Sequence, residues 1–151
     1  SFSSDFDIYK ITIDDCSTSG TTQTAIRLSL NNASCSEIAS NYNYALLRLN
    51  AHASFSEVKS TSASNYYIGV CDQEPEGLGS SVYVFNPYQT DRYTMVMSNS
   101  VGWYNAGGVE LTNINAVHNV RVNARATGLK FYGRASGDID LKLRCYGIRR
   151  D

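Results

Sequence analysis

The side chains that most often act as catalytic bases or metal ligands are sparse in this 151-residue chain, which holds two histidines and four cysteines. Imidazole titrates near neutral pH, so histidine is the usual general base and a frequent metal ligand. His52 falls on the outward side of a predicted strand, and His118 falls in the polar stretch 115–119. Neither has a carboxylate or a cysteine beside it in the sequence. We therefore predict that both are ordinary surface or strand residues.

The four cysteines are spaced too widely for a Cys-x-x-Cys metal or redox motif. They are Cys16, Cys35, Cys71 and Cys145. Four cysteines allow three disulfide pairings, and spacing does not choose among them. Cys145 lies on the apolar face of the predicted strand 139–145, where a free buried thiol is common. Free buried thiols are the favoured alternative, and at least one disulfide is the other.

Nucleophilic and acid–base sites have no sequence signature. The chain contains 19 serines but no Gly-x-Ser-x-Gly elbow. The acidic turn with Asp72, Glu74 and Glu76 could offer oxygens to calcium, yet it lacks the spacing of an EF-hand. Asp138 and Asp140 share the outer face of a predicted strand, whereas paired glycosidase carboxylates need a cleft. We expect no enzyme and assign no catalytic residue, metal or cofactor; a secreted hydrolase is the lowest alternative.

Aromatic and polar side chains concentrate in two predicted loops. The candidate ligand-binding residues are Trp103, Tyr104 and Asn105 in one loop, and Tyr88, Asp91 and Arg92 in the other. Aromatic rings with amide, carboxylate or guanidinium groups suit sugars, and Tyr, Trp and Arg also anchor protein interfaces. The alternative is that Trp103 plugs the end of the domain and the tyrosines cap the core with their hydroxyls in water.

Basic residues gather near the C-terminus, because residues 121–151 carry eight Lys or Arg and three Asp or Glu, a net +5. Residues 1–120 must then carry −6, since the whole chain is −1. If 120–126, 129–133 and 139–147 form a meander, one outer face holds Arg121, Arg125, Lys130, Arg134, Lys142 and Arg144. Such a face suits an anionic glycan, a phosphate-rich surface or an acidic flank of a second copy. The alternative is a solvated face with cross-strand ion pairs. A pI near 6.1 disfavours nucleic acid.

The elements that must position these residues read as strands, because apolar residues alternate with polar ones along most of the chain. The predicted strands are 6–14, 26–30, 47–55, 66–70, 82–85, 93–97, 120–126, 129–131 and 139–145. In 47–55 the alternation places Leu47, Leu49 and Phe55 inward. A capping box of Ser34 and Glu37 predicts one short helix that fades by 41–43. We expect an all-β single antiparallel β-sandwich or jelly-roll-like domain over 1–151, with about eight to nine strands and at most one short helix.

The composition supports that class. Hydrophobic residues make up 42% and charged residues 18%, against roughly 25% charged in a typical domain. Ten Thr and 13 Asn join the serines, a mixture that disfavours helical bundles, coiled coils and disordered chains. No apolar run approaches the roughly 18 residues that cross a bilayer, so membrane insertion is not expected. The chain opens at Ser1 and its first methionine is Met95, so we expect it to be excised from a longer chain.

Together these features predict a non-enzymatic binding or attachment domain for a cell-surface glycan or protein receptor. The Ser-, Thr-, Asn- and Tyr-rich β composition over the whole chain resembles, in style, the receptor-binding heads of phage or viral fibres and capsid projections. That resemblance implies a homo-oligomer at an extracellular or virion surface. The alternative is a structural or assembly domain of a coat or shell, packing against neighbouring copies.

Overall fold

The computed structural model describes residues 1–19, 24–51, 55–71, 77–105, 109–134 and 138–149. In these residues the chain forms strands and no helix, which confirms the all-β prediction. The strands are β1 (Ile8–Thr18), β2 (Thr24–Asn31), β3 (Tyr42–Asn50), β4 (Ser56–Ala63), β5 (Tyr66–Cys71), β6 (Leu78–Phe85), β7 (Met95–Asn105), β8 (Val109–Val120), β9 (Gly128–Gly133) and β10 (Ile139–Ile148).

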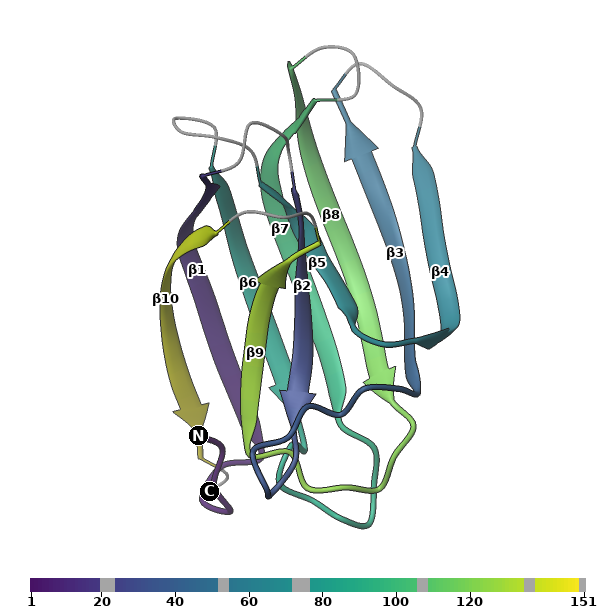
Figure 1. Ribbon diagram of the computed structural model, residues 1–151, viewed down its shortest axis with the longest axis vertical. Helices are drawn as coiled ribbons and strands as arrows, with labels where there is room; N and C mark the ends of the chain where they lie inside the picture. Colours follow the sequence, from purple (N-terminus) through teal and green to yellow (C-terminus); the bar gives the residue numbers. More distant parts are fainter. Residues whose placement is uncertain (20–23, 52–54, 72–76, 106–108, 135–137, 150–151) are drawn as a thin grey trace.

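The strands form two antiparallel sheets of unequal size. The larger has seven strands in the order β10-β1-β6-β7-β8-β3-β4, and the smaller has three in the order β5-β2-β9. Figure 1 shows the smaller sheet lying across part of the larger one. The arrangement is a β-sandwich in which the three-stranded sheet covers one face of the seven-stranded sheet.

The core fills the space between the two sheets. Ile26, Leu28 and Leu30 of β2 are fully buried, as their alternation with polar neighbours predicts. Opposite them, alternate residues such as Val82 and Val84 of β6 are equally buried. Each such side chain contributes roughly 1.5–3 kcal/mol by leaving water. The hydrophobic alternation of these strands is therefore what holds the sheets face to face.

Strand β5 is buried along its whole length, on both of its faces. A β-bulge leaves Ile68 without a register partner, because Ile26 pairs with Gly69 and Arg27 pairs with Tyr67. Tyr67 and Val70 belong to a second apolar cluster with residues of β3 and β8. Strand β5 thus contacts the larger sheet with side chains from both faces, although it is an edge strand of its own sheet.

The predicted strand 47–55 is wrong in its bounds and in its inward face. Strand β3 ends at Asn50 and β4 begins at Ser56. Leu46 is 4% exposed and packs in the second apolar cluster, whereas Leu47 is 44% exposed on the opposite face. Phe55 is 75% exposed. The side of β3 that faces the core is therefore the side that carries Leu46, because Leu46 packs with Tyr67 and Val70 of β5. His52 lies outside the described residues.

The short helix expected from Ser34 and Glu37 is not formed. The side-chain oxygen of Asn32 accepts hydrogen bonds from the backbone N–H of Ser34 (2.9 Å) and of Ser36 (3.1 Å). These bonds close a tight turn in which Cys35 has a φ of 58°, outside the right-handed helical region. The Asn32 side chain therefore stabilises a turn in place of the helix that Ser34 was predicted to cap.

The predicted C-terminal meander is also wrong. Strand β9 pairs with β2 in the smaller sheet, and β10 pairs with β1 in the larger sheet. Residues 121–127 form no strand. Cys145 does lie on the same side of β10 as Leu143, but it is exposed rather than buried. The reason is that β10 is an edge strand of the larger sheet.

Candidate functional site: the outer face of the seven-stranded sheet

The face of the seven-stranded sheet that points away from β5, β2 and β9 is covered by no described element. It carries large apolar side chains that are 42–58% exposed. These are Leu47, Met95, Met97, Val101, Leu111, Val117, Tyr146 and Ile148. Exposed apolar side chains gathered on one face make this face the candidate for an interaction site.

The strand register sorts these side chains into rows that cross the sheet. One row runs through Tyr83, Met97, Val117 and Ala45, which pair in sequence across β6, β7, β8 and β3. We call it the apolar row. The next runs through Ser81, Asn99, Asn115 and Leu47 on the same four strands. We call it the asparagine row. Facing residues in a row are close enough to act as one surface.

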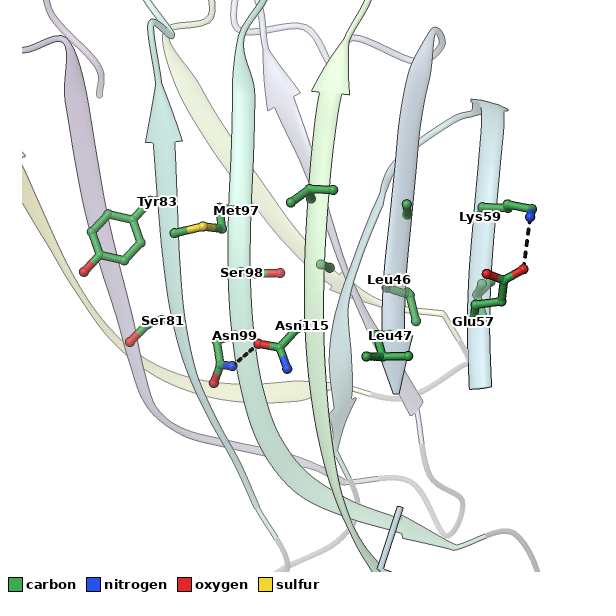
Figure 2. A pocket seen from close by; sticks show the side chains of 14 residues that line it. Leu46, Leu47, Glu57, Lys59, Ser81, Tyr83, Met97, Ser98, Asn99 and Asn115 are labelled. Carbon is green, nitrogen blue, oxygen red and sulfur yellow. Dashed lines mark hydrogen bonds and ion pairs between the residues drawn. The ribbon is translucent and has the colours of Figure 1, made fainter. Parts of the chain in front are cut away.

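A groove of about 540 Å³ lies over both rows. Figure 2 shows Tyr83 and Met97 on one side, Asn99 and Asn115 in the middle, and Glu57 and Lys59 of β4 on the other side. A second hollow of about 670 Å³ adjoins it and shares Ala45, Lys59 and Val117 with it. We call the two together the outer groove. It crosses several strands rather than following a loop.

The asparagine row is held by its own hydrogen bonds. The side-chain amide of Asn99 donates to the side-chain oxygen of Asn115. Asn115 donates to the side-chain oxygen of Asn113 (2.6 Å), and Asn113 donates to the carbonyl of Ser100 (3.0 Å). A carboxamide has two N–H donors and two acceptor lone pairs, so each can bond a neighbour and still serve a partner. The row therefore presents amides of fixed orientation.

The charged groups of the outer groove are Glu57 and Lys59 on β4, which form an ion pair of 3.0 Å. Both side chains are 74% exposed, so the pair is screened by water and easily rearranged. Glu57 is the only carboxylate among the described residues that line the groove. The groove thus offers apolar contact and amide hydrogen bonds rather than an acid–base pair.

His118 is not poised for catalysis. Its side chain is buried on the core side of β8, where its Nε2 lies 3.3 Å from the hydroxyl of Ser98. Its ring also packs against Tyr66, with ring centroids 4.7 Å apart. Burial lowers the pKa of His118 to about 3, because the charged imidazolium would lose its hydration. The imidazole is therefore neutral across the physiological range and serves as a core residue.

The two aromatic loops predicted from the sequence do not come together. Trp103 is near the end of β7, while Tyr88, Asp91 and Arg92 lie in the connection that precedes the same strand. Met95 and Trp103 are separated by eight residues of extended chain, which is about 27 Å. Figure 1 shows the connection between β6 and β7 at the opposite end of the sheet from the end of β7. The side chains of Tyr104 and Asn105 lie outside what the structure describes.

The loop residues are engaged with each other. Arg92 donates two hydrogen bonds of 3.2 Å to the Asp91 carboxylate, which holds the pKa of that carboxyl below its usual range. The guanidinium of Arg125 lies 4.3 Å from the centre of the Tyr88 ring. Their role in binding stays a prediction, now confined to one end of the sandwich.

The six basic residues do not form one face. Arg121 and Arg125 lie between β8 and β9; Lys130 lies on β9 and Arg134 just after it; Lys142 and Arg144 lie on β10. Lys130 pairs with Glu37 at 2.8 Å, Lys142 pairs with Asp15 at 3.3 Å, and Arg144 pairs with Asp14. The cross-strand ion pairs weighed as the alternative are therefore present between β1 and β10.

Sequence analysis missed the residues of the outer groove, because outward strand positions were expected to be polar. The signal that could have found them is a pair of adjacent apolar residues within one strand. Leu46–Leu47, Val96–Met97 and Ala116–Val117 each put one side chain in the core and the next on the outer face.

Within the described ranges, no three His, Cys, Asp or Glu side chains gather where they could hold a metal ion. The acidic turn with Asp72, Glu74 and Glu76 lies outside those ranges. No helix long and apolar enough to cross a membrane occurs in the described part of the chain. The chain matches no protein-family model, no curated protein and no solved structure.

Proposed function

We propose that this chain is a non-enzymatic binding domain that attaches to the surface of a partner protein through the outer groove. The observation that carries the proposal is the apolar row beside the asparagine row on an uncovered sheet face. An apolar centre with oriented hydrogen-bonding groups is the usual composition of a protein-binding surface. An attachment domain at a cell or virion surface would use such a face to hold its receptor.

The chemistry and size of the face favour a protein partner. Met97, Val117 and Leu47 are aliphatic, and Met is enriched in interfaces while Lys and Glu are depleted. Seven strands at about 4.8 Å spacing, each about 27 Å long, give a face of about 900 Å², which is large enough for the roughly 800 Å² that one partner contributes to a standard interface. The charged Glu57 and Lys59 lie toward the edge strand β4, where a polar rim is expected.

Binding is favoured over hydrolysis by the state of the titratable groups. Glu57 is already ion-paired with Lys59, and His118 is neutral and faces the core. A hydrolytic site needs a nucleophile or activated water beside a base. The nearest approach to such a combination is the Ser98 hydroxyl 3.3 Å from His118 Nε2, and both of these side chains are buried on the core side of the sheet.

A glycan is the second candidate ligand, because the half-buried ring of Tyr83 in β6 lies one strand away from the amide of Asn99 and two strands away from that of Asn115. Sugars stack on aromatic rings and exchange hydrogen bonds with amides. The aliphatic share of the surface makes this the weaker candidate.

The test compares Met97→Asp/Val117→Asp with a matched control, Ser62→Asp, on an exposed position of β4. Each protein is applied to an array of receptor ectodomains and to a glycan array. We expect the parent and the control to bind an ectodomain, and the double variant to lose at least tenfold in affinity while its circular dichroism is unchanged. Binding that survives the double variant overturns the proposal. Binding to glycans alone selects the second candidate, and a mass that doubles or triples with concentration selects the assembly alternative.

A further inference from the structure

Two cysteines meet inside the sandwich. Cys16 is in β1 of the seven-stranded sheet, and Cys71 is the last residue of β5 in the three-stranded sheet. Both are completely buried and belong to the same apolar cluster. The neighbouring Cys71 thiol is the largest cause that raises the pKa of the Cys16 thiol, as expected for two side chains that lie close together. The two residues therefore face each other across the gap between the sheets.

Local irregularities of both strands direct the two thiols to this point. In β1 a bulge at Asp14 shifts the alternation, so that Ile13 opposite Leu143 and Cys16 opposite Leu141 both face inward. Without the extra residue, an even-numbered Cys16 would face outward with Thr12. In β5 the bulge at Ile68 has the same effect, since Cys71 then pairs with the buried Thr24 of β2.

The other two cysteines have different surroundings. Cys145 is exposed on β10, opposite Ile11 of β1, and Cys35 is exposed in the turn after β2. A disulfide requires the two Cβ atoms to be roughly 4 Å apart with their bonds pointing toward each other. Of the four cysteines, Cys16 and Cys71 are the two that lie buried in one cluster, whereas Cys35 and Cys145 are exposed.

We propose that Cys16 and Cys71 form a disulfide that joins the two sheets when the chain is exposed to a low-molecular-weight disulfide such as oxidised glutathione. The thiolate of one cysteine attacks the small disulfide and forms a mixed disulfide with one half of it, which breaks the small S–S bond and releases the other half as a thiol. The thiolate of the second cysteine then displaces the second small thiol and forms the protein S–S bond. Two protein thiols are oxidised, and one small disulfide is reduced to two thiols.

The timing of the reaction follows from burial. The neighbouring Cys71 thiol and the loss of hydration raise the pKa of the Cys16 thiol, so the reactive thiolate is scarce in the folded chain. Oxidation is therefore fast during folding or when the sheets open, and slow in the closed protein. The same burial protects the disulfide from reductants once it has formed.

The test uses Cys35→Ser/Cys145→Ser, which keeps only the buried pair. The variant is folded in a buffer of reduced and oxidised glutathione, denatured, alkylated with iodoacetamide and weighed. We expect a monomer that has lost the mass of two hydrogens, takes up no label, and gives a peptide linking Cys16 to Cys71. Closing this loop is expected to raise the midpoint of thermal unfolding by on the order of 10 °C relative to the reduced form.

The control is Cys16→Ala in the same background, which leaves one thiol. It should show no midpoint shift on oxidation, and the first variant decides the question even if this control folds poorly. Two labelled thiols, a glutathione adduct on either cysteine, or a dimer linked between chains in place of the internal bond would overturn the proposal.

Discussion

The hydroxyl of Ser100 in β7 donates a hydrogen bond of 2.8 Å to the carbonyl of Ile68 in β5, and so ties the larger sheet to the smaller one. Ile68 is the bulge residue that has no register partner in β2. The Ser80 hydroxyl lies 2.7 Å from that of Ser100 and continues the chain of hydrogen bonds. The Ser100 hydroxyl thus bonds the carbonyl of a buried residue that has no register partner in β2.

Removal of this hydroxyl should cost stability. Ser100→Ala would leave the buried Ile68 carbonyl without the bond, at a cost of about 1–3 kcal/mol in the free energy of unfolding. Ser81→Ala, at a half-buried position on the outer face, is the matched control and should change it by less than about 0.5 kcal/mol. Urea unfolding followed by circular dichroism measures both. Equal midpoints for the two variants would contradict the role given to Ser100.

The close approach of β5 and β7 leads to a second prediction about stability. A Cβ added at Gly102 would lie 2.9 Å from the carbonyl oxygen of Val70, so the two strands would have to separate. Gly102→Ala should destabilise the protein by about 1–3 kcal/mol. At Gly79 the nearest atom to an added Cβ is 3.8 Å away, so Gly79→Ala should be tolerated. Thermal midpoints compare the two; similar losses at both positions would show that the sheets are not in contact at Gly102.

The buried imidazole predicts how stability changes with pH. The pKa of His118 is about 3 in the folded protein, against 6.5 for the free side chain. Between these values the unfolded chain binds a proton that the folded protein excludes, so stability falls as the pH drops below about 6.5 and is lost progressively toward pH 3. The full effect is on the order of several kcal/mol.

The measurement is the urea concentration at the midpoint of unfolding. It is taken for the parent and for His118→Phe at pH values from 7 down to the lowest at which both proteins are folded. Carboxylates titrate in both proteins, so the difference between the two curves isolates the histidine. The parent should lose stability relative to the variant between about pH 6 and pH 4. Parallel curves would place the imidazole in water instead of the core.

Adjacent residues of β7 test the orientation of the outer face. Met97 is 46% exposed, whereas Val96 is buried. Met97→Ala should change the free energy of unfolding by less than about 0.5 kcal/mol, while Val96→Ala should cost about 2 kcal/mol. Unfolding of the two variants in guanidinium chloride measures both changes in the free energy of unfolding. A larger loss at Met97 would mean that the outer face is covered in solution, which a change in mass with concentration would reveal.

Strand alternation is a local property, and it was sufficient to predict the inward faces of β2 and β6 from the sequence. Bulges are different, because Asp14 and Ile68 are extra residues only with respect to a partner strand. The pairing of β1 with β10 joins Ile8 to Ile148, and no local sequence pattern predicts a pairing between residues so far apart in the chain. The outer groove escaped prediction for the same reason, since its rows are assembled from four strands that only the register aligns.

The pairing of Ile8 with Ile148 also has a mechanical consequence. The first strand and the last strand are antiparallel neighbours, so the chain enters and leaves the sheet side by side. Force applied between these two strand ends would unzip the β1–β10 ladder one pair at a time from that end, which is the weak direction of a sheet. A domain anchored through β1 and loaded through its outer face would instead carry the tension across the central strands, because β10 lies on the other side of β1 and is outside that path.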